Sequence, residues 1–373
     1  MTNADVRVLI KGVIACAAPA PIKWAVGDIS RQIAGVRLCD PKVFAKVSFD
    51  PTGYLALDEA IGGGWAAGEC STISAPSAMG KTVFAVNLAY RASRIGVPVG
   101  IISLEMPDAD IWKLACCIGA NLKRLSLRHG NLTATESGLL STELTNMAGR
   151  SLFVFDRTFF PVNAKEPEAP TMDVIGKLVR DGIRHYGIRL WFVDYLAKIG
   201  PFGDDDLTRM PRLTTGVLDL VRRTGVHFCC LMQANKSAFS RREDKTKKLT
   251  IGLEDTKGTI ETVADFDTCI GLIRDDWNSS APVDPAPMSA VVLKARHGPG
   301  GTVPLEFFKA TGRILEPVGY QSAAAPTPAS SASTNSPGSS AEGVAEERTF
   351  YRPQKKEESG VKFSGKLCAT NQP

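Results

Sequence analysis

The stretch from Ser71 to Tyr90, STISAPSAMGKTVFAVNLAY, carries the residue types of a phosphate-binding loop. An apolar segment leads into a short loop and then a helical pattern, with Gly80, Lys81 and Thr82 at the junction. Backbone N–H groups at a helix N-terminus bind anions, the lysine reaches the β- and γ-phosphates, and the hydroxyl binds Mg²⁺. We therefore predict a site for ATP (or a dNTP) and Mg²⁺. Its binding residues are Ala75, Pro76, Ser77, Ala78, Met79, Gly80, Lys81, Thr82 and Val83.

Ala75 stands where this motif usually has its first glycine. That glycine mainly eases the start of the loop, and alanine is the smallest replacement for it. The alternative is a chance Gly-Lys-Thr in a turn. The strand-like segment before it and the helix-like segment after it argue against that alternative.

Two carboxylates and one amide end strand-like segments elsewhere in the chain. Asp194 ends LWFVD, where it would support Mg²⁺ together with Thr82. Glu105 follows GIISL, where a carboxylate orients or deprotonates the attacking water, and Gln233 ends VHFCCLMQ, where an amide senses the γ-phosphate. Each of them alone is compatible with a solvated strand end. Because the carboxyl ends of parallel strands meet at one edge of a sheet, we expect all three beside the phosphate loop.

These residues need a framework of alternating strands and helices, and the chain has that pattern between residues 49 and 318. Several strand-like segments are apolar throughout, which is typical of a parallel sheet buried on both faces. We predict the α/β class with a mostly parallel sheet. The expected strands are 70–75, 98–105, 151–156, 188–196, 226–233, 266–273 and 289–295, and the expected helices are 81–93, 107–120, 172–185 and about 213–224.

The two flanks differ from this core. Segment 319–373 begins with an Ala/Ser/Pro/Thr-rich stretch without large apolar residues, so we expect a disordered tail, with a short partner-binding peptide near its end as the alternative. Segment 1–48 contains PIKWAVGDISRQIAG, whose Pro21 and Gly35 suit a helix start and stop. This helix would dock on the same chain or on a neighbouring one.

The overall composition excludes several classes of protein. The 373 residues are 44% hydrophobic and carry a net charge of +5, so a role in binding nucleic acid must rest on local clusters. The nine cysteines include no C-x-x-C pair, and residues 6–18 make a poor signal peptide because Arg7 and Lys11 break their apolar run. No stretch approaches about 20 apolar residues. We therefore expect a cytoplasmic protein without a membrane span.

The motifs together resemble the ATPase domain of DnaB-type replicative helicases, a RecA-like P-loop fold. The resemblance rests on APSAMGKT, SLEMP, VDYL, LMQ, GTIETVAD and KARHGPGGT, in the same order over about residues 49–317. It implies a ring, expected to be a hexamer, that moves 5′ to 3′ on single-stranded DNA, hydrolyses ATP at subunit interfaces and unwinds a duplex at a replication fork. It also implies roles for Lys81, Thr82, Glu105, Asp194 and Gln233 as given above, and makes Lys294 and Arg296 a basic pair that enters the neighbour's site.

A dense run of basic residues follows Gln233, where the resemblance places a loop that faces the central channel. Lysine and arginine neutralise phosphates without reading sequence. A second segment, DTKGTIETVAD, resembles another DNA-facing stretch of the family. The DNA-binding residues we predict are Lys236, Arg241, Arg242, Lys245, Lys247, Lys248, Lys257 and Gly258.

The chain departs from the family pattern in several places, including an insertion at 165–170, and two of the departures bear on fold and function. Pro211 and Gly216 are expected to interrupt the helix after the Asp194 strand. Segment 1–48 does not match the family's larger N-terminal domain, so we expect a phage- or plasmid-type helicase whose primase and loader are separate proteins. Two alternatives stay open: a non-unwinding DNA-dependent ATPase of recombinase or mediator type, and a regulatory ATPase without a DNA role.

Overall fold

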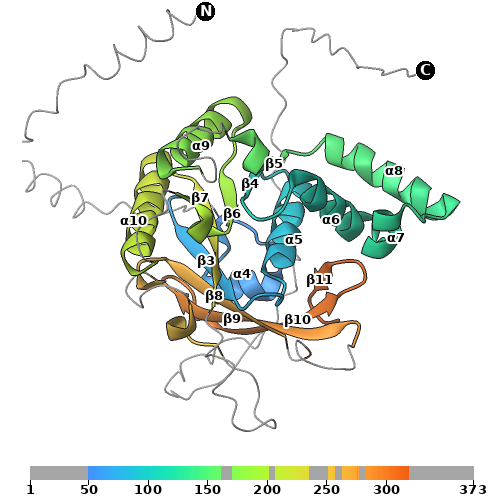
Figure 1. Ribbon diagram of the computed structural model, residues 1–373. Coiled ribbons are helices and arrows are strands. Elements are labelled where there is room, and N and C mark those ends of the chain that lie inside the picture. The colour runs from blue at the N-terminus through green and yellow to red at the C-terminus, as the bar shows by residue number, and fades with distance from the viewer. Residues whose placement is uncertain are drawn as a thin grey trace, which may run out of the picture. The chain divides into compact units, whose positions relative to one another are not determined.

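The computed structural model describes residues 49–160, 170–200, 206–234, 251–256, 263–274, 276 and 283–318 (Figure 1). All of them belong to one of the two units into which the chain divides, Met1–Ala325. The expected docking helix in segment 1–48 and the expected tail at 319–373 lie outside the described residues.

A nine-stranded sheet forms the centre of the described structure, in the order β11-β10-β9-β8-β3-β7-β6-β4-β5. The strands from β8 to β5 in this order are parallel, and β9, β10 and β11 extend the sheet in antiparallel fashion. The predicted α/β class with a mostly parallel sheet is therefore confirmed. The bounds are β3 (Cys70–Ala75), β4 (Val99–Ser103), β5 (Leu152–Asp156), β6 (Leu190–Asp194), β7 (His227–Gln233), β8 (Thr268–Arg274), β9 (Ala286–Ala295), β10 (Gly301–Phe308) and β11 (Arg313–Leu315), with a separate pair β1 (Phe49–Asp50) and β2 (Trp65–Ala66).

Helices cover both faces of the sheet (Figure 1). One apolar core lies under α4 (Leu55–Ile61), α5 (Lys81–Arg94) and α6 (Asp108–Ala120), and the other lies under α9 (Met172–Tyr186) and α10 (Asp206–Thr224). Further helical elements are α7 (Arg124–His129), α8 (Ala134–Ala148) and short 3₁₀ turns at Arg157–Phe159, Leu196–Lys198 and Leu253–Asp255. In the described part of the chain, no helix has the length and apolar character that crossing a membrane requires.

Helix α10 corrects the expectation of a break at Pro211 and Gly216. The helix runs continuously through both positions. Pro211 removes one backbone hydrogen bond because it has no N–H, but the buried side chains of Leu213 and Val217 hold the helix against the sheet. At Gly216 a Cβ atom would lie 3.4 Å from the side chain of Met172 on α9, an ordinary contact distance, so the helix accommodates glycine there without a packing requirement for it.

Several elements lie outside the sequence prediction, namely β1, β2, α4, α7, α8, β10 and β11. Two parts of this set carry a signal in the sequence. The first is α8, which begins with a capping box: the Thr133 side chain accepts from the Glu136 backbone N–H, and the Glu136 side chain accepts from the Thr133 backbone N–H. The sequence T-x-x-E carries that signal. The second is the antiparallel extension by β10 and β11. Its signal is the glycine-rich turn at 298–301 followed by apolar residues at alternate positions, Val303, Leu305 and Phe307, which are buried in the structure.

Two glycines set the distance between layers around Trp191, which is fully buried in β6. A Cβ atom on Gly100 in β4 would lie 2.5 Å from the Trp191 ring, and one on Gly182 in α9 would lie 2.6 Å from it. Neither position has room for a side chain. Trp191 thereby fixes how closely α9 approaches the strand that ends in Asp194.

We predict that Gly182→Ala lowers the free energy of unfolding by roughly 1–3 kcal/mol, because the added methyl group overlaps Trp191. Gly138→Ala in α8 is the matched control, since a Cβ atom there meets nothing within 4 Å. It should raise helix stability by roughly 0.4–1 kcal/mol. Urea unfolding of both variants measures the difference, and equal effects at the two glycines would contradict the packing described.

Candidate nucleotide-binding site

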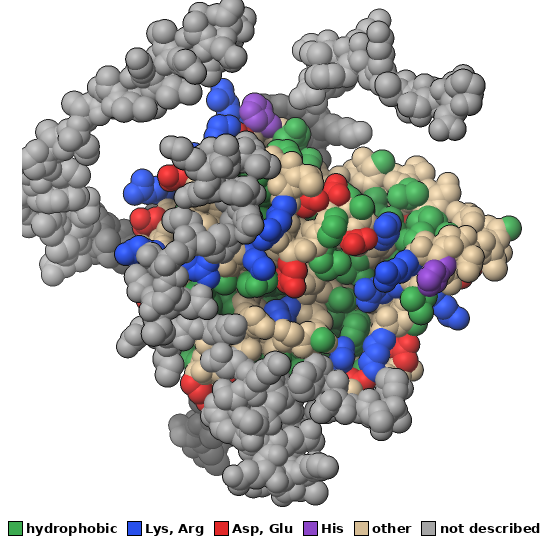
Figure 2. Space-filling view, in the orientation of Figure 1, with side chains coloured by type: hydrophobic (Ala, Val, Ile, Leu, Met, Phe, Trp, Pro, Cys, Tyr) green, Lys and Arg blue, Asp and Glu red, His purple; other side chains and the backbone are tan. Residues whose placement is uncertain are grey.

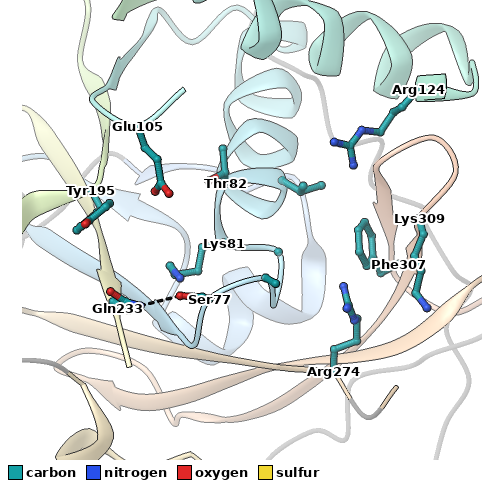
Figure 3. Close-up of a pocket in the computed structure, with 13 residues that line it drawn as sticks. Ser77, Lys81, Thr82, Glu105, Arg124, Tyr195, Gln233, Arg274, Phe307 and Lys309 are labelled. Carbon is teal, nitrogen blue, oxygen red and sulfur yellow. Dashed lines mark hydrogen bonds between the residues drawn. The ribbon is translucent and has the colours of Figure 1, made fainter. Parts of the chain in front are cut away.

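The carboxyl ends of adjacent parallel strands bring the predicted site residues together. Ala75 at the end of β3 is level with Gln233 at the end of β7, and Ser103 at the end of β4 is level with Asp194 at the end of β6. Glu105 follows two residues after β4. The phosphate loop, both carboxylates and the amide therefore lie at one edge of the sheet, as Figure 3 shows.

The backbone of the phosphate loop accounts for alanine at position 75. Ala75 is the last residue of β3, is fully buried, and has the extended conformation that any residue adopts. The left-handed positions come later, at Ala78 with φ of 63° and at Gly80 with φ of 109°. Glycine is therefore required at Gly80, where the backbone enters α5, and is dispensable at Ala75.

Lys81 is held inside the phosphate loop. Its Nζ atom donates to the carbonyl oxygens of Ala75, at 2.9 Å, and Pro76, at 3.2 Å. Burial lowers the pKa of Lys81, and the nearby charges of Asp194 and Glu105 raise it in part. An ammonium group satisfied only by neutral carbonyls can transfer its hydrogen bonds to phosphate oxygens, which are charged acceptors.

Thr82 and Asp194 form the contact that fits a divalent cation. The Thr82 hydroxyl donates to Oδ2 of Asp194 at 2.5 Å, and Oδ1 of Asp194 is buried without a hydrogen-bond partner among the described residues. Burial, together with the charge of Glu105, raises the pKa of Asp194 to about 6, although the Thr82 hydrogen bond lowers it in part. A hydroxyl and a carboxylate with an unsatisfied oxygen are the hard oxygen donors that Mg²⁺ takes.

Glu105 and Gln233 lie on the same side of Lys81. Gln233 Nε2 donates to the Ser77 hydroxyl at 2.7 Å, so the amide reaches the phosphate loop directly (Figure 3). Glu105 is exposed and points into the same space, near Tyr195. This end of the site therefore presents a carboxylate and an amide beside Lys81 (Figure 3).

The cavity continues past the phosphate loop to a second end that the sequence did not reveal. The whole cavity has a volume of about 540 Å³. Besides the predicted residues, its walls include Arg124, Tyr195, Arg274, Phe307 and Lys309. Figure 3 shows Arg124, Phe307, Lys309 and Arg274 on the side away from Glu105. The signals in the sequence were weak: Arg274 ends an apolar strand-like run, and Lys309 follows another.

Cations dominate this second end. Asp276 is buried and forms ion pairs with Arg274 (2.8 Å) and with Lys309. Arg124 is exposed at the start of α7, and its backbone N–H donates to the carbonyl oxygen of Ala310 at 2.8 Å. Figure 2 shows lysine and arginine side chains gathered over α7 and near β10 on this face.

Lys294 and Arg296 do not line the cavity of their own chain. Ala295, which lies between them, pairs with Thr268 in β8. Thr268 in turn pairs with Ser71 near the amino end of β3. Ser71 is four residues, or roughly 13 Å of strand, from Ala75 at the start of the phosphate loop. The basic pair therefore lies near the amino end of β3, and the phosphate loop follows the carboxyl end of the same strand.

The predicted DNA-binding residues all lie outside the described residues: Lys236, Arg241, Arg242, Lys245, Lys247, Lys248, Lys257 and Gly258. Two described residues border the predicted segments: Ala234 lies before the first of them, and Thr256 directly precedes Lys257. The Ala234 backbone N–H donates to the Ala75 carbonyl at 3.0 Å, and Ala234 forms an antiparallel bridge with Thr256. The Thr256 hydroxyl donates to the Ser74 hydroxyl at 3.0 Å. These hydrogen bonds attach Ala234 and Thr256 to the end of β3, beside the phosphate loop.

Comparison with known proteins gives a consistent family. The family model described as the DnaB-like helicase C terminal domain matches residues 51–316. Over 269 residues the chain is 27% identical to the replicative DNA helicase DnaB of Geobacillus stearothermophilus, covering 71% of this chain and 56% of that protein. Over 272 residues it is 27% identical to a probable plasmid replicative DNA helicase of Chlamydia psittaci, covering 71% of this chain and 55% of that protein. The chain thus spans little more than half the length of these relatives.

Solved structures share the fold. One of them, described as an ATPase domain, superposes with a TM-score of 0.63 at 21% identity, covering 77% of this chain and 98% of that one. Another, described as a DnaB-like replicative helicase with its interactions with primase, gives a TM-score of 0.64 at 21% identity, covering 83% of this chain and 70% of that one.

The raised pKa of Asp194 leads to a prediction about stability. Because its folded-state pKa of about 6 lies above the ordinary value of 3.8, the folded protein binds the proton more tightly, and ionisation of Asp194 opposes folding above pH 6. Asp194→Asn should therefore raise the free energy of unfolding at pH 8 by about 1–3 kcal/mol. The gain should shrink as the pH falls through 6 towards 4.

Urea unfolding at pH 8 and pH 4 measures this effect. Asp265→Asn, at an exposed position, is the control and should change stability by less than about 0.5 kcal/mol at either pH. If the Asp194→Asn protein is less stable than the wild type at pH 8, burial of the ionised Asp194 carboxylate does not destabilise the folded protein.

Proposed function

This chain belongs to the DnaB-like helicase C-terminal domain family, and on that premise we propose that it is an ATP-driven replicative DNA helicase. The observation that carries the proposal is the Thr82–Asp194 contact beside Lys81, with an unsatisfied carboxylate oxygen at its centre. Glu105 and Gln233 complete the set on the adjoining strands. These residues have the types and positions that phosphoryl transfer requires.

In the proposed reaction, Lys81 exchanges its carbonyl partners for the β- and γ-phosphates of ATP. Thr82 and Asp194 would hold Mg²⁺, which when bound neutralises charge on those phosphates. Glu105 orients the attacking water and accepts its proton, and Gln233 contacts the γ-phosphate. Because Gln233 bonds to Ser77 and is followed by Ala234, loss of the γ-phosphate changes contacts at the start of the basic segment.

The second end of the cavity is where we propose that the nucleoside lies. With the γ-phosphate beside Glu105 and Gln233, the base and ribose extend towards Arg124 and Phe307 (Figure 3). The guanidinium of Arg124 is suited to stack on a base, because it is planar and weakly hydrated. The ion pairs with Asp276 leave Arg274 and Lys309 less available for that role.

We propose that the chain works as a homo-oligomeric ring, with six subunits, that moves 5′ to 3′ on single-stranded DNA. The position of Lys294 and Arg296 supports subunit contact at the site: they lie at the edge of the sheet away from their own phosphate loop, so a phosphate they contact belongs to a neighbour. A separate primase and a loader would act with the ring. The residues that would neutralise DNA phosphates are Lys236, Arg241, Arg242, Lys245, Lys247, Lys248 and Lys257, the last of them next to Gly258.

The first test is unwinding of a forked duplex. The wild type should separate the strands in the presence of ATP and Mg²⁺, and Lys81→Ala should abolish both hydrolysis and unwinding because it removes the phosphate-binding cation. The rate should fall steeply as salt rises, since phosphate contacts release counterions. ATP hydrolysis stimulated by single-stranded DNA without strand separation would instead support a recombinase- or mediator-type ATPase.

The second test concerns the nucleoside end of the cavity. Arg124→Ala should weaken ADP binding by roughly 5- to 30-fold, the equivalent of about 1–2 kcal/mol for a lost cation–π contact, and should leave pyrophosphate binding unchanged. Arg128→Ala is the matched control, because Arg128 is exposed on the same helix and does not line the cavity. Isothermal titration calorimetry measures the affinity of each variant for ADP and for pyrophosphate. If Arg124→Ala weakens the binding of ADP and of pyrophosphate equally, Arg124 contacts the phosphates and not the base.

A further inference from the structure

One short segment receives both members of the basic pair. The Nζ atom of Lys294 donates to the carbonyl oxygens of Ala264 and of Phe266, the latter at 2.7 Å. Arg296 Nη1 lies 2.7 Å from Oδ1 of Asp267, and the Arg296 backbone N–H donates to the Asp267 carbonyl at 2.9 Å. Segment Ala264–Asp267 therefore fixes the direction of both cations.

Asp267 is itself anchored to the central sheet. Its second carboxylate oxygen, Oδ2, accepts from the Cys70 backbone N–H at 2.9 Å, and its own backbone N–H donates to the Cys70 carbonyl at 2.9 Å. Cys70 is the first residue of β3, the strand that ends in the phosphate loop. Asp267 thus joins Arg296 at one end of β3 to the nucleotide site at the other end.

The ion pair is asymmetric in exposure. The side chain of Asp267 is 13% exposed, whereas that of Arg296 is 50% exposed. A guanidinium has five N–H donors, and the Asp267 contact uses the Nη1 side. With half of its side chain exposed, Arg296 can also reach a group of another chain, while the buried Asp267 limits its rotamers.

We propose that Asp267 is a positioning residue that holds Arg296 in the orientation from which it contacts a phosphate bound by the neighbouring subunit. This inference rests on the proposed function, in which Arg296 acts on the neighbour's site. Fixing an arginine side chain costs conformational entropy. Because the ion pair with Asp267 restricts the Arg296 rotamers before the subunits associate, less entropy is lost when Arg296 contacts the phosphate. Small errors in such an orientation reduce rates by as much as about 100-fold.

Asp267→Asn separates this role from a purely structural one. The asparagine carbonyl oxygen can still accept from the Cys70 backbone N–H, but its amide group no longer pairs with the guanidinium. Asp219→Asn is the control, because it removes the same charge from an exposed position on α10, outside the nucleotide site and outside segment Ala264–Asp267. Thermal unfolding verifies that each variant folds, and Asp267→Ala, which also removes the acceptor for Cys70, shows the effect of losing the anchor.

The expected result for Asp267→Asn is a loss of kcat for DNA-stimulated ATP hydrolysis of roughly 10- to 100-fold, with ADP affinity within about 2-fold of the wild type. Asp219→Asn should behave as the wild type, and Arg296→Ala should be inactive. The positioning role is contradicted if Asp267→Asn hydrolyses ATP like the wild type while Arg296→Ala is inactive. If Arg296→Ala itself hydrolyses normally, the proposed action on the neighbour's site fails, and the positioning role fails with it.

Mixed assemblies give a readout that a structural defect would not produce. Lys81→Ala subunits cannot bind nucleotide productively but carry an intact Arg296 and Asp267. Mixed with Asp267→Asn subunits, they should restore hydrolysis above the mean of the two parents, because they supply a correctly held arginine to intact phosphate loops. Mixing Asp267→Asn with Arg296→Ala should give no gain. Absence of a gain in the first mixture, with subunit exchange verified by energy transfer, would overturn the proposal.

Discussion

The parallel hydrogen bonding of β3 with its neighbours is the constraint on which the rest of the structure depends. Pairing of Ala75 with Gln233, and of Ser103 with Asp194, places the phosphate loop, two carboxylates and an amide at one edge of the sheet. The same register places Asp267 beside Cys70 at the other edge, where Arg296 is held. One strand thus separates the group that binds a nucleotide from the cation that we propose acts on the neighbour's nucleotide.

The site retains features that oppose folding and support chemistry. Asp194 is 2% exposed, and one of its oxygens lacks a hydrogen-bond partner among the described residues, so its ionised form is costly. Lys81 is satisfied by neutral carbonyl oxygens alone among the described residues. In the complex that we propose with nucleotide and Mg²⁺, both groups would gain an oppositely charged partner. Buried groups with strongly perturbed pKa values are typical of functional sites for this reason.

The sequence predicted the sheet class and placed Glu105, Asp194 and Gln233 together, because each follows an apolar run and parallel strands align their carboxyl ends. It failed at Pro211 and Gly216, where the buried side chains of α10 outweigh local helix propensity. It also missed Arg124, Arg274, Phe307 and Lys309. These residues meet only because β9–β11 extend the sheet and α7 contacts the turn at Ala310, and such long-range contacts leave no local periodicity.

In the assembly that we propose, each nucleotide lies between the phosphate loop of one subunit and Arg296 of the next. A structure of the assembled protein with a non-hydrolysable ATP analogue, Mg²⁺ and single-stranded DNA tests this arrangement most directly. We predict a closed ring with the Arg296 guanidinium at hydrogen-bond distance, roughly 3 Å, from the γ-phosphate on the neighbouring subunit. An open filament, or a ring in which Arg296 is more than about 8 Å from every phosphate and so beyond contact, would contradict it.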